Sequence, residues 1–341
     1  MIRALSDNRA HIEQLCSLLG LGTSRGSISR VPGGFHHSMW RLETENGRYA
    51  VKQLAEDMDM GDADTVAQIN ATEVTAREFS GHGVPALYSL SLDRQHLQLL
   101  DGIGYLVYPW TNAKACHRNG IEERHAVIVA STLAHMHRSD IDIPELRDVP
   151  TFPVTVERAT ELVQMARQRN VRYSDILEDR LDDLLQVVEL HAPALERLAS
   201  HQVISHGDLD HKNVLWDEAG EPVLIDWESA RRLNPTYELL LEALDWGGIT
   251  ANFDARPFTT ILQAYVDAGG VINKDLIPAV SDAIQGAWAS WLLYNVGRAI
   301  GLKDTHQRAI GSGQVDLALS ALLRMEKQKD KLTAIALQYA S

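Results

Sequence analysis

The chain has 341 residues, of which 45% are hydrophobic, and it carries a formal charge of −14. This length and composition predict a globular protein that buries a sizeable core in one large domain or two lobes. The acidic balance argues against a nucleic-acid partner, because phosphate binding requires clustered Lys and Arg. The same balance either favours a cationic ligand or, as the preferred explanation for most of the charge, keeps the protein soluble.

The first residues interrupt their apolar run with four polar residues between positions 7 and 13, unlike the unbroken apolar centre of a signal peptide. Nothing later in the chain approaches the length of a membrane span. The two cysteines, Cys16 and Cys116, have neither metal-ligand spacing nor the density of a disulfide scaffold. These features predict a cytoplasmic protein without membrane contact, and they leave the oligomeric state open.

The N-terminal part of the chain alternates between helical and strand patterns. Residues 12–22 predict a helix that ends at a glycine pair, and residues 27–55 contain strand-like runs with a hairpin turn at 45–47. Residues 64–80 follow a helical period, and residues 87–110 return to strands. The outline is a small β-rich region.

From about residue 121 onward the pattern is mostly long helices, interrupted by short strands between residues 203 and 230. No internal repeat is present. We therefore expect an α+β protein with a β-rich N-terminal lobe over residues 1–110 and a larger, mainly helical lobe over residues 111–341.

The stretch from Val203 to Ala230 places two aspartates and an asparagine at the edges of two apolar runs. Asp226 ends a buried-strand pattern, where a carboxylate either pairs with a cation or binds a metal. Asp208 and Asn213 lie on either side of a tight loop. Carboxylate and amide oxygens suit Mg²⁺, and the remaining carboxylate can accept a proton from an attacking hydroxyl.

This arrangement resembles the catalytic loop and the metal-binding D-F-G segment of protein kinases, with Gly207 in place of Arg and, within I-D-W-E, Asp226-Trp227-Glu228 in place of D-F-G. The H-G-D and I-D-W variants are similar to the aminoglycoside phosphotransferase and choline kinase family of small-molecule kinases. The resemblance covers most of the chain, because other family segments follow in the expected order. It implies a bilobal, protein-kinase-like fold.

The resemblance also implies roles for individual residues. Asp208 would orient and deprotonate the acceptor hydroxyl, and Asn213 and Asp226 would bind Mg²⁺. The residues expected to contact ATP, or another purine nucleoside triphosphate, are Lys52 at the phosphates, Glu73 as its partner, Gly33 and Gly34 in the glycine-rich loop, and Tyr108 and Trp110 beside the base.

Several assignments keep an alternative. Glu78 competes with Glu73 as the partner of Lys52, although Glu73 shares one helical stripe with apolar residues. His206 is expected to order the catalytic loop by hydrogen bonding, whereas His36 and His37 are either phosphate contacts or exposed turn residues. Glu238 stands where the family usually has an aspartate, which puts the bracing role of that position in doubt.

The resulting prediction is an ATP-dependent kinase that phosphorylates a hydroxyl of a small molecule, such as an amino alcohol, an aminoglycoside-like compound or another antibiotic or metabolite. The alternative is a non-catalytic nucleotide-binding protein with a kinase-like fold. A protein kinase is disfavoured by the H-G-D form and by the lack of a recognisable A-P-E segment. The sequence does not choose the acceptor; the side chains that are candidates to contact it are Asp210, Glu242, Asp245, Trp246, Trp291 and Tyr294, although core packing is the favoured role for Trp288 and Trp291.

Overall fold

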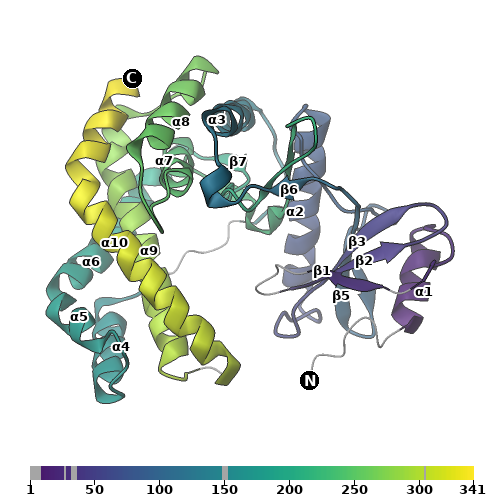
Figure 1. Cartoon of the computed structure of the whole chain (residues 1–341), viewed down its shortest axis with the longest axis horizontal. Helices are drawn as coiled ribbons and strands as arrows, with labels where there is room; N and C mark the ends of the chain where they lie inside the picture. Colours follow the sequence, from purple (N-terminus) through teal and green to yellow (C-terminus); the bar gives the residue numbers. More distant parts are fainter. Residues whose placement is uncertain (1–8, 27, 32–36, 148–152, 303–304) are drawn as a thin grey trace. The chain divides into compact units, whose positions relative to one another are not determined.

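The computed structural model describes residues 9–26, 28–31, 37–147, 153–302 and 305–341. The chain forms two compact units, each assembled from segments far apart in the sequence (Figure 1). The first, here called the sheet unit, comprises Met1–Cys116, Ile141–Asp148 and His206–Arg231, and the second, the helical unit, comprises His117–Asp140, Val149–Ser205 and Arg232–Ser341. The segment that carries the H-G-D and I-D-W motifs thus belongs to the sheet unit.

The sheet unit is built on a five-stranded antiparallel sheet with the order β1-β2-β3-β5-β4. Its strands are β1 (Ser29–Val31), β2 (Ser38–Glu43), β3 (Arg48–Gln53), β4 (Gln98–Leu100) and β5 (Ile103–Pro109). In the β3–β5 ladder Val51 pairs with Val107 and Lys52 pairs with Leu106. Because side chains alternate along a strand, Lys52 and Leu106 share the face opposite to Val51 and Val107.

A helix packs on each face of this sheet. Helix α1 (Arg9–Leu18) buries Ile12 and Leu15 against the face that carries Val51 and Val107. On the other face, Val66 and Ile69 of helix α2 (Ala63–Gly81) pack around Leu106. Lys52 therefore emerges on the α2 side of the sheet.

The remaining parts of the sheet unit form a second, smaller sheet with the order β6-β8-β9. It consists of β6 (Lys114–Ala115), β8 (Val214–Trp216) and β9 (Pro222–Leu224), and a short 3₁₀ helix, η3 (Trp227–Ser229), follows. Leu224 exchanges backbone hydrogen bonds with Pro85 and Leu87, which anchors β9 to the segment after α2. This anchoring brings the end of β9 to the α2 side of the first sheet.

The helical unit is built around the long helices α6, α9 and α10, with α4 packed against them. Its longer helices and its strand are α3 (Glu123–Arg138), α4 (Val156–Gln168), α5 (Ser174–Asp179), α6 (Leu181–Leu198), β7 (Val203–Ser205), α7 (Pro235–Trp246), α8 (Ala255–Asp267), α9 (Ile277–Ala299) and α10 (Thr305–Tyr339). The 3₁₀ helices η2 (Arg118–Gly120) and η4 (Lys274–Leu276) and the strand β10 (Arg231–Leu233), which pairs with β7, complete the described elements.

The predicted helices over 12–22 and 64–80 correspond to α1 and α2, and the predicted strands of residues 27–55 and 87–110 form the first sheet. Within the described ranges, no helix is both long and apolar enough to cross a membrane. The assignment of residues 1–110 and 111–341 to separate functional lobes stays a prediction.

Candidate active site

Lys52 lies at the centre of a charged cluster in the sheet unit. Its Nζ donates to Asp226 Oδ1 at 2.7 Å and to Glu228 Oε2 at 2.8 Å, and its side chain is only 10% exposed. Burial alone would lower the pKa of Lys52, but the charges of Asp226 and Glu228 outweigh this and raise the pKa above its usual value. The lysine is therefore held as a cation at the end of its strand.

Asp226 reaches this cluster through an unusual backbone conformation. Its φ of 64° lies in the left-handed region, which Asp tolerates better than most non-glycine residues. The next residue, Trp227, is 2% exposed and stacks on Phe79 of α2 with a centroid distance of 5.4 Å. The buried tryptophan fixes the turn, so that the carboxylates on either side of it project toward Lys52.

His206 links the two motifs. Its Nδ1 accepts the backbone N–H of Asp208 at 3.3 Å, so the ring proton is on Nε2, which lies 2.9 Å from the carbonyl oxygen of Ile225. The ring also packs against Trp227 at a centroid distance of 4.6 Å. His206 thus ties the H-G-D loop to the residue before Asp226, in agreement with its expected ordering role.

Gly207 has a steric reason to be glycine. Its φ is 79°, and a Cβ at this position would lie 2.3 Å from the carbonyl oxygen of Ser229 and 2.5 Å from Nη1 of Arg231. The Arg231 guanidinium donates to the carbonyl oxygens of both Gly207 and Ser229. This contact closes the loop. An arginine at position 207, as in the protein-kinase motif, would not permit it.

Asp208 and Asn213 contact each other directly across the loop. The Asn213 amide nitrogen donates to the Asp208 carbonyl oxygen at 2.8 Å and to its carboxylate at 3.0 Å, which leaves the amide oxygen for a cation. The Asp208 side chain stays accessible to a ligand. Even so, the protein packed around it and the charge of Asp210 raise the pKa of Asp208 to about 7.

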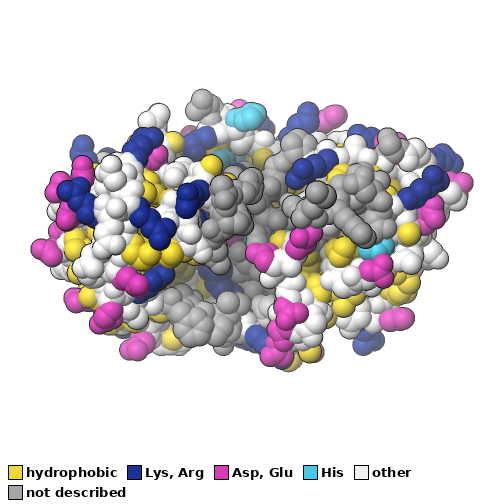
Figure 2. Space-filling view, turned by 90° about the horizontal axis from the view of Figure 1, so that it is seen from below, with side chains coloured by type: hydrophobic (Ala, Val, Ile, Leu, Met, Phe, Trp, Pro, Cys, Tyr) yellow, Lys and Arg dark blue, Asp and Glu magenta, His cyan; other side chains and the backbone are white. Residues whose placement is uncertain are grey.

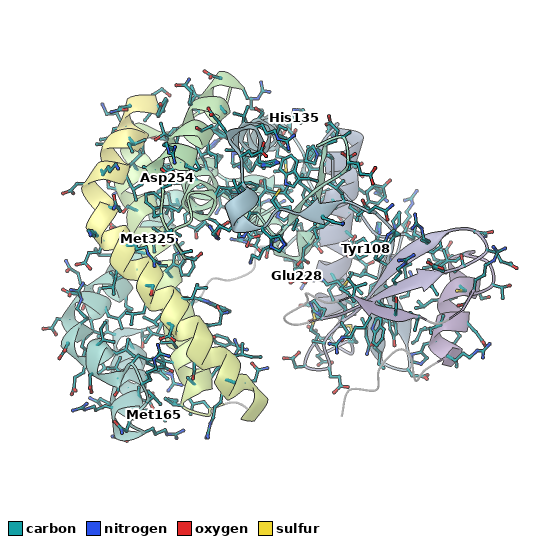
Figure 3. The ribbon with its side chains drawn as sticks, viewed as in Figure 1. Tyr108, His135, Met165, Glu228, Asp254 and Met325 are labelled. Atoms are coloured by element: carbon teal, nitrogen blue, oxygen red, sulfur yellow. The ribbon has the colours of Figure 1, made fainter. Side chains whose placement is uncertain are left out.

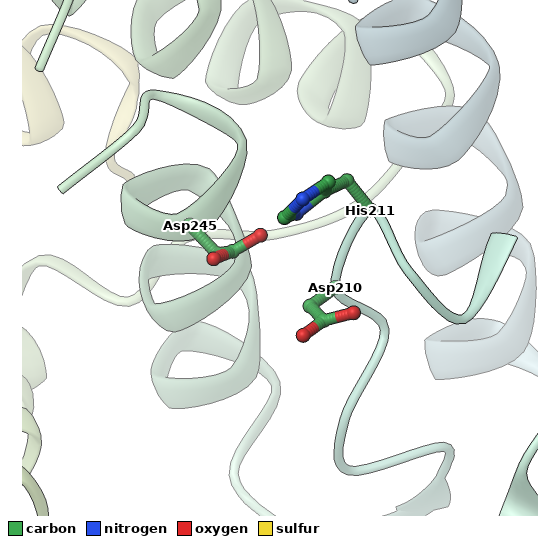
Figure 4. Close-up of side chains that lie close together, drawn as sticks. All are labelled: Asp210, His211 and Asp245. Atoms are coloured by element: carbon green, nitrogen blue, oxygen red, sulfur yellow. The ribbon is translucent and has the colours of Figure 1, made fainter. Parts of the chain in front are cut away.

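Two further members of this loop, Asp210 and His211, follow Asp208 (Figure 4). Asp210 is buried, accepts the backbone N–H of Lys212 at 2.8 Å and pairs with the Lys212 ammonium at 2.6 Å. The Asp210 carboxylate therefore stabilises the loop conformation through two contacts with Lys212, both within the sheet unit.

Glu228, labelled in Figure 3, is a member of the Lys52 cluster that was not predicted from the sequence. Besides Lys52, it contacts His37 Nε2 at 3.0 Å, and His37 Nδ1 accepts the backbone N–H of Ala55. Burial raises the pKa of Glu228, but the His37 hydrogen bond and the Lys52 charge outweigh burial and lower it. The signal available in the sequence is a further carboxylate two residues after Asp226.

Glu73 is not bonded to Lys52 in this structure. Its carboxylate accepts the Tyr108 hydroxyl at 2.5 Å and the backbone N–H of Ser89 at 2.7 Å. Glu73 is buried, and burial raises its pKa. Glu78, the alternative partner, is partly exposed and pairs with Arg77. The carboxylates that Lys52 contacts thus come from the I-D-W-E segment and not from α2.

The two aromatic residues expected beside the base have partners within the sheet unit. The Tyr108 hydroxyl donates a hydrogen bond to Glu73, and burial and the Glu73 charge raise the pKa of Tyr108. The Arg41 guanidinium lies 5.1 Å from the centroid of the Trp110 ring, and the indole N–H donates to Asn112. Gly33, Gly34 and His36 lie outside the described residues.

The acceptor candidates of the helical unit differ in exposure. Glu242 and Trp246 are buried, and Asp245 pairs with Arg118 at 3.1 Å; Asp245 projects from α7 (Figure 4). Trp288 packs against the helical core, as expected, whereas Trp291 is 41% exposed and stacks on Tyr294. Core packing was therefore the wrong expectation for Trp291, because Trp291 and Tyr294 lie on the exposed side of α9.

Glu238, which replaces the family's usual aspartate, is buried in the helical unit and contacts His137 Nε2 of α3 at 2.7 Å. His137 Nδ1 in turn lies 2.8 Å from the hydroxyl of Tyr265 on α8. The glutamate thus joins α7 to α3 and α8.

Asn213 and Asp226 fit a magnesium ion by the chemistry of their donor atoms. Asn213 offers an amide oxygen, and Asp226 a carboxylate of which one oxygen contacts Lys52. These hard oxygen donors, together with the charge cluster and the accessible Asp208 carboxylate, form a set suited to phosphoryl transfer.

Comparison with protein families agrees with this geometry: a profile described as "Phosphotransferase enzyme family" matches residues 27–275. The chain belongs to the phosphotransferase enzyme family. The match includes the residues expected to bind nucleotide and metal and the expected base, from Gly33 to Asp226, but not the acceptor candidates Trp291 and Tyr294. A search of curated protein sequences finds no match for this phosphotransferase.

Solved structures resemble the phosphotransferase over nearly its whole length. Spectinomycin phosphotransferase in complex with ADP and spectinomycin has 14% identity and a TM-score of 0.63, and the match covers 96% of this chain and 98% of that one. A choline/ethanolamine kinase family protein from Mesorhizobium loti has 16% identity, a TM-score of 0.60 and coverage of 97% and 99%.

An ethanolamine kinase from Plasmodium vivax has 13% identity and a TM-score of 0.58, and the match covers 89% of this chain and 84% of that chain. These likenesses confirm the predicted kinase-like α+β fold.

Proposed function

We propose that this phosphotransferase moves the γ-phosphoryl group of ATP, or of another purine nucleoside triphosphate, to a hydroxyl of a small molecule. The observation that carries the proposal is the convergence of Lys52, Asp226 and Glu228 in the same unit as the Asp208–Asn213 pair. A cation beside carboxylates, with an accessible base next to them, suits a reaction that depends on positioning and charge neutralisation.

Each residue has a defined part in this proposal. Lys52 would contact the nucleotide phosphates, which would take the place that Glu228 now occupies at its ammonium. Asn213 and Asp226 would hold Mg²⁺, which neutralises the charge on the phosphate oxygens. Asp208 would accept a hydrogen bond from the acceptor hydroxyl and then its proton, and a pKa of about 7 suits that task near neutral pH.

The acceptor is proposed only as a class: an amino alcohol, an aminoglycoside-like compound or another hydroxylated metabolite or antibiotic. The formal charge of −14 supports a cationic acceptor. Acidic and basic side chains are interspersed over the face shown in Figure 2, which supports a small-molecule acceptor better than a nucleic acid. The chain has only two cysteines, without the density of a disulfide scaffold, which supports a cytoplasmic location.

A nucleotide-consumption screen tests the proposal. The purified protein, with ATP and Mg²⁺, is offered amino alcohols, aminoglycosides, macrolides and sugars, and phosphorylated product is identified by mass. The Asp208→Asn variant is the matched control, because it keeps the side-chain size but not the charge. Transfer by the wild type and not by the variant is the expected result. Equal rates in both would rule out the role of Asp208.

A non-catalytic nucleotide-binding protein remains the second candidate, and one observation favours it. Lys52 forms ion pairs with Asp226 and Glu228. Glu73 accepts hydrogen bonds from Tyr108 and Ser89. The Lys–Glu pair expected of an active kinase is therefore not formed between Lys52 and Glu73. The two candidates differ in outcome. Nucleotide binding without transfer to any acceptor in the screen would favour the non-catalytic protein.

A further inference from the structure

The helical unit contains a pocket between α6, α9 and α10 that includes none of the residues proposed for phosphoryl transfer. Its cavity volume is about 210 Å³. Aliphatic side chains from all three helices line it, among them Leu184, Val187, Leu292, Leu319 and Leu322. For comparison, a leucine-lined cavity of about 150 Å³ takes up benzene. The pocket therefore accommodates an apolar group somewhat larger than one benzene ring.

Charged side chains surround this apolar pocket. Three carboxylates (Asp183, Asp282 and Glu326) and two cations (Arg180 and Lys329) are among its lining residues. Arg180 pairs with both Asp183 and Glu326, so two carboxylates share one guanidinium. The rim consequently carries one negative charge more than it carries positive charges.

Asp282 is the carboxylate best placed to bind a ligand. Its side chain is 26% exposed, compared with 62% for Asp183 and 56% for Glu326, so it is the least hydrated of the three. Its ion pair with Lys329 is 3.6 Å long, which exceeds hydrogen-bond distance. Lys329 is 49% exposed, so its long side chain can turn into solvent when another cation approaches.

We propose that this pocket binds a small amphiphile with one aliphatic or ring-shaped apolar group and one ammonium group. The apolar group lies among the leucines between α6 and α10, and the ammonium group replaces Lys329 at Asp282. This site goes beyond the proposed phosphoryl transfer and does not depend on it. A carboxylate-bearing amphiphile fits less well, because it would meet the excess negative charge of the rim.

Three probes of equal chain length test the proposal: n-hexylammonium, 1-hexanol and hexanoate, titrated into the full chain without nucleotide and followed by ligand-observed NMR. We expect affinity to decrease in the order ammonium, alcohol, carboxylate. Shortening hexylammonium to butylammonium should weaken binding by roughly tenfold, because two fewer methylenes are buried. No binding of hexylammonium at millimolar concentration, or equal binding of hexanoate, would overturn the proposal.

Variants locate the site. Asp282→Asn should weaken hexylammonium by roughly three- to tenfold, leave hexanol unchanged and improve hexanoate, because Lys329 is then unpaired. Asp330→Asn removes a carboxylate from α10, next to Lys329 in the sequence but outside the pocket, and should change none of the three affinities.

A pocket-filling change, Val187→Phe, should weaken all three probes. If this variant does not fold, comparison of Asp282→Asn with Asp330→Asn still tests whether the ammonium group binds at Asp282. Loss of ammonium binding to the same extent in both variants would show attraction to the general negative charge of the protein and contradict a site at Asp282.

Discussion

The carboxylate of Asp208 is accessible, yet its pKa is raised to about 7, and its nearest polar partner is the Asn213 amide. In the proposed reaction it contacts the acceptor and not the nucleotide. Asp208→Asn should therefore lower kcat by roughly 10²- to 10⁴-fold, the usual contribution of a positioned general base. ATP affinity, measured by calorimetry, should be nearly unchanged. A parallel loss of ATP affinity would place Asp208 in nucleotide binding instead.

The same group predicts how the rate depends on pH. A base must be deprotonated to act, so kcat should rise with pH up to about 7, where the raised pKa of Asp208 lies. Bound Mg²⁺ stabilises the charged form and would move the midpoint lower. The measurement is kcat against pH at saturating substrates. A rate that increases as the pH is lowered from 7 to 5 would contradict a carboxylate base.

Asp226 and Asn213 differ in charge, and this difference predicts unequal effects. Asp226→Ala removes the proposed charged metal ligand and also one partner of Lys52, whereas Asn213→Ala removes the proposed neutral ligand. Both changes should reduce turnover, with Asp226→Ala the more damaging, and excess Mg²⁺ should partly restore the asparagine variant. Turnover measured over a Mg²⁺ titration checks this. Full activity of either variant at limiting Mg²⁺ would show that its residue is not a metal ligand.

At the scale of elements, helical periodicity correctly predicted that Glu73 points inward from α2, since Glu73 and Ala76 are both buried. Its bonding partner was beyond sequence reasoning. Tyr108 reaches Glu73 from β5, and Glu228 reaches Lys52 only because Asp226 adopts a left-handed turn. The periodicity of a sequence predicts which face of a helix or strand is buried. It does not predict such pairings, because they depend on local backbone conformations, such as the left-handed one of Asp226, that most residues avoid.

Helices α6 and α9 pack closely at Gly286, and this contact predicts a stability change. A Cβ on Gly286 would lie 2.2 Å from Cγ of the buried His191 ring. Gly286→Ala should therefore destabilise the protein by roughly 1–3 kcal/mol, as overpacking in a core does. Gly313→Ala on α10 is the matched control, because its Cβ would meet nothing within 4 Å.

The Gly313→Ala change should stabilise slightly through helix propensity, by up to about 1 kcal/mol. Denaturant unfolding of both variants measures the two effects. Equal stability of the two variants would show that α6 and α9 are not packed as closely as described.

At the scale of the whole molecule, the motif order predicted the kinase-like fold, because each short motif depends on a few residues in a fixed local geometry. The exposure of Trp291 was not predictable in this way. Apolar residues are spread around helix α9 and are not confined to one side. Its sequence therefore carries little amphipathic signal to mark the exposed side. The assignment of His206–Arg231 to the sheet unit likewise depends on tertiary contacts rather than on chain order.

The described residues proposed to bind nucleotide and metal, and Asp208 as the proposed base, all belong to the sheet unit, which leads to a prediction about the stability of the chain. ATP with Mg²⁺ should raise the Tm by several degrees, because ligand at about 100 times its Kd stabilises the folded state by about 2.7 kcal/mol. Hydrogen exchange should slow mainly in β3, in the H-G-D loop and around η3. Lys52→Met should abolish the shift, since it removes the cation next to Asp226 and Glu228. Lys114→Met, an equal charge change at an exposed position on β6, should preserve it. If nucleotide and Mg²⁺ shift the Tm of Lys52→Met as much as that of the wild type, the nucleotide binds elsewhere on the chain.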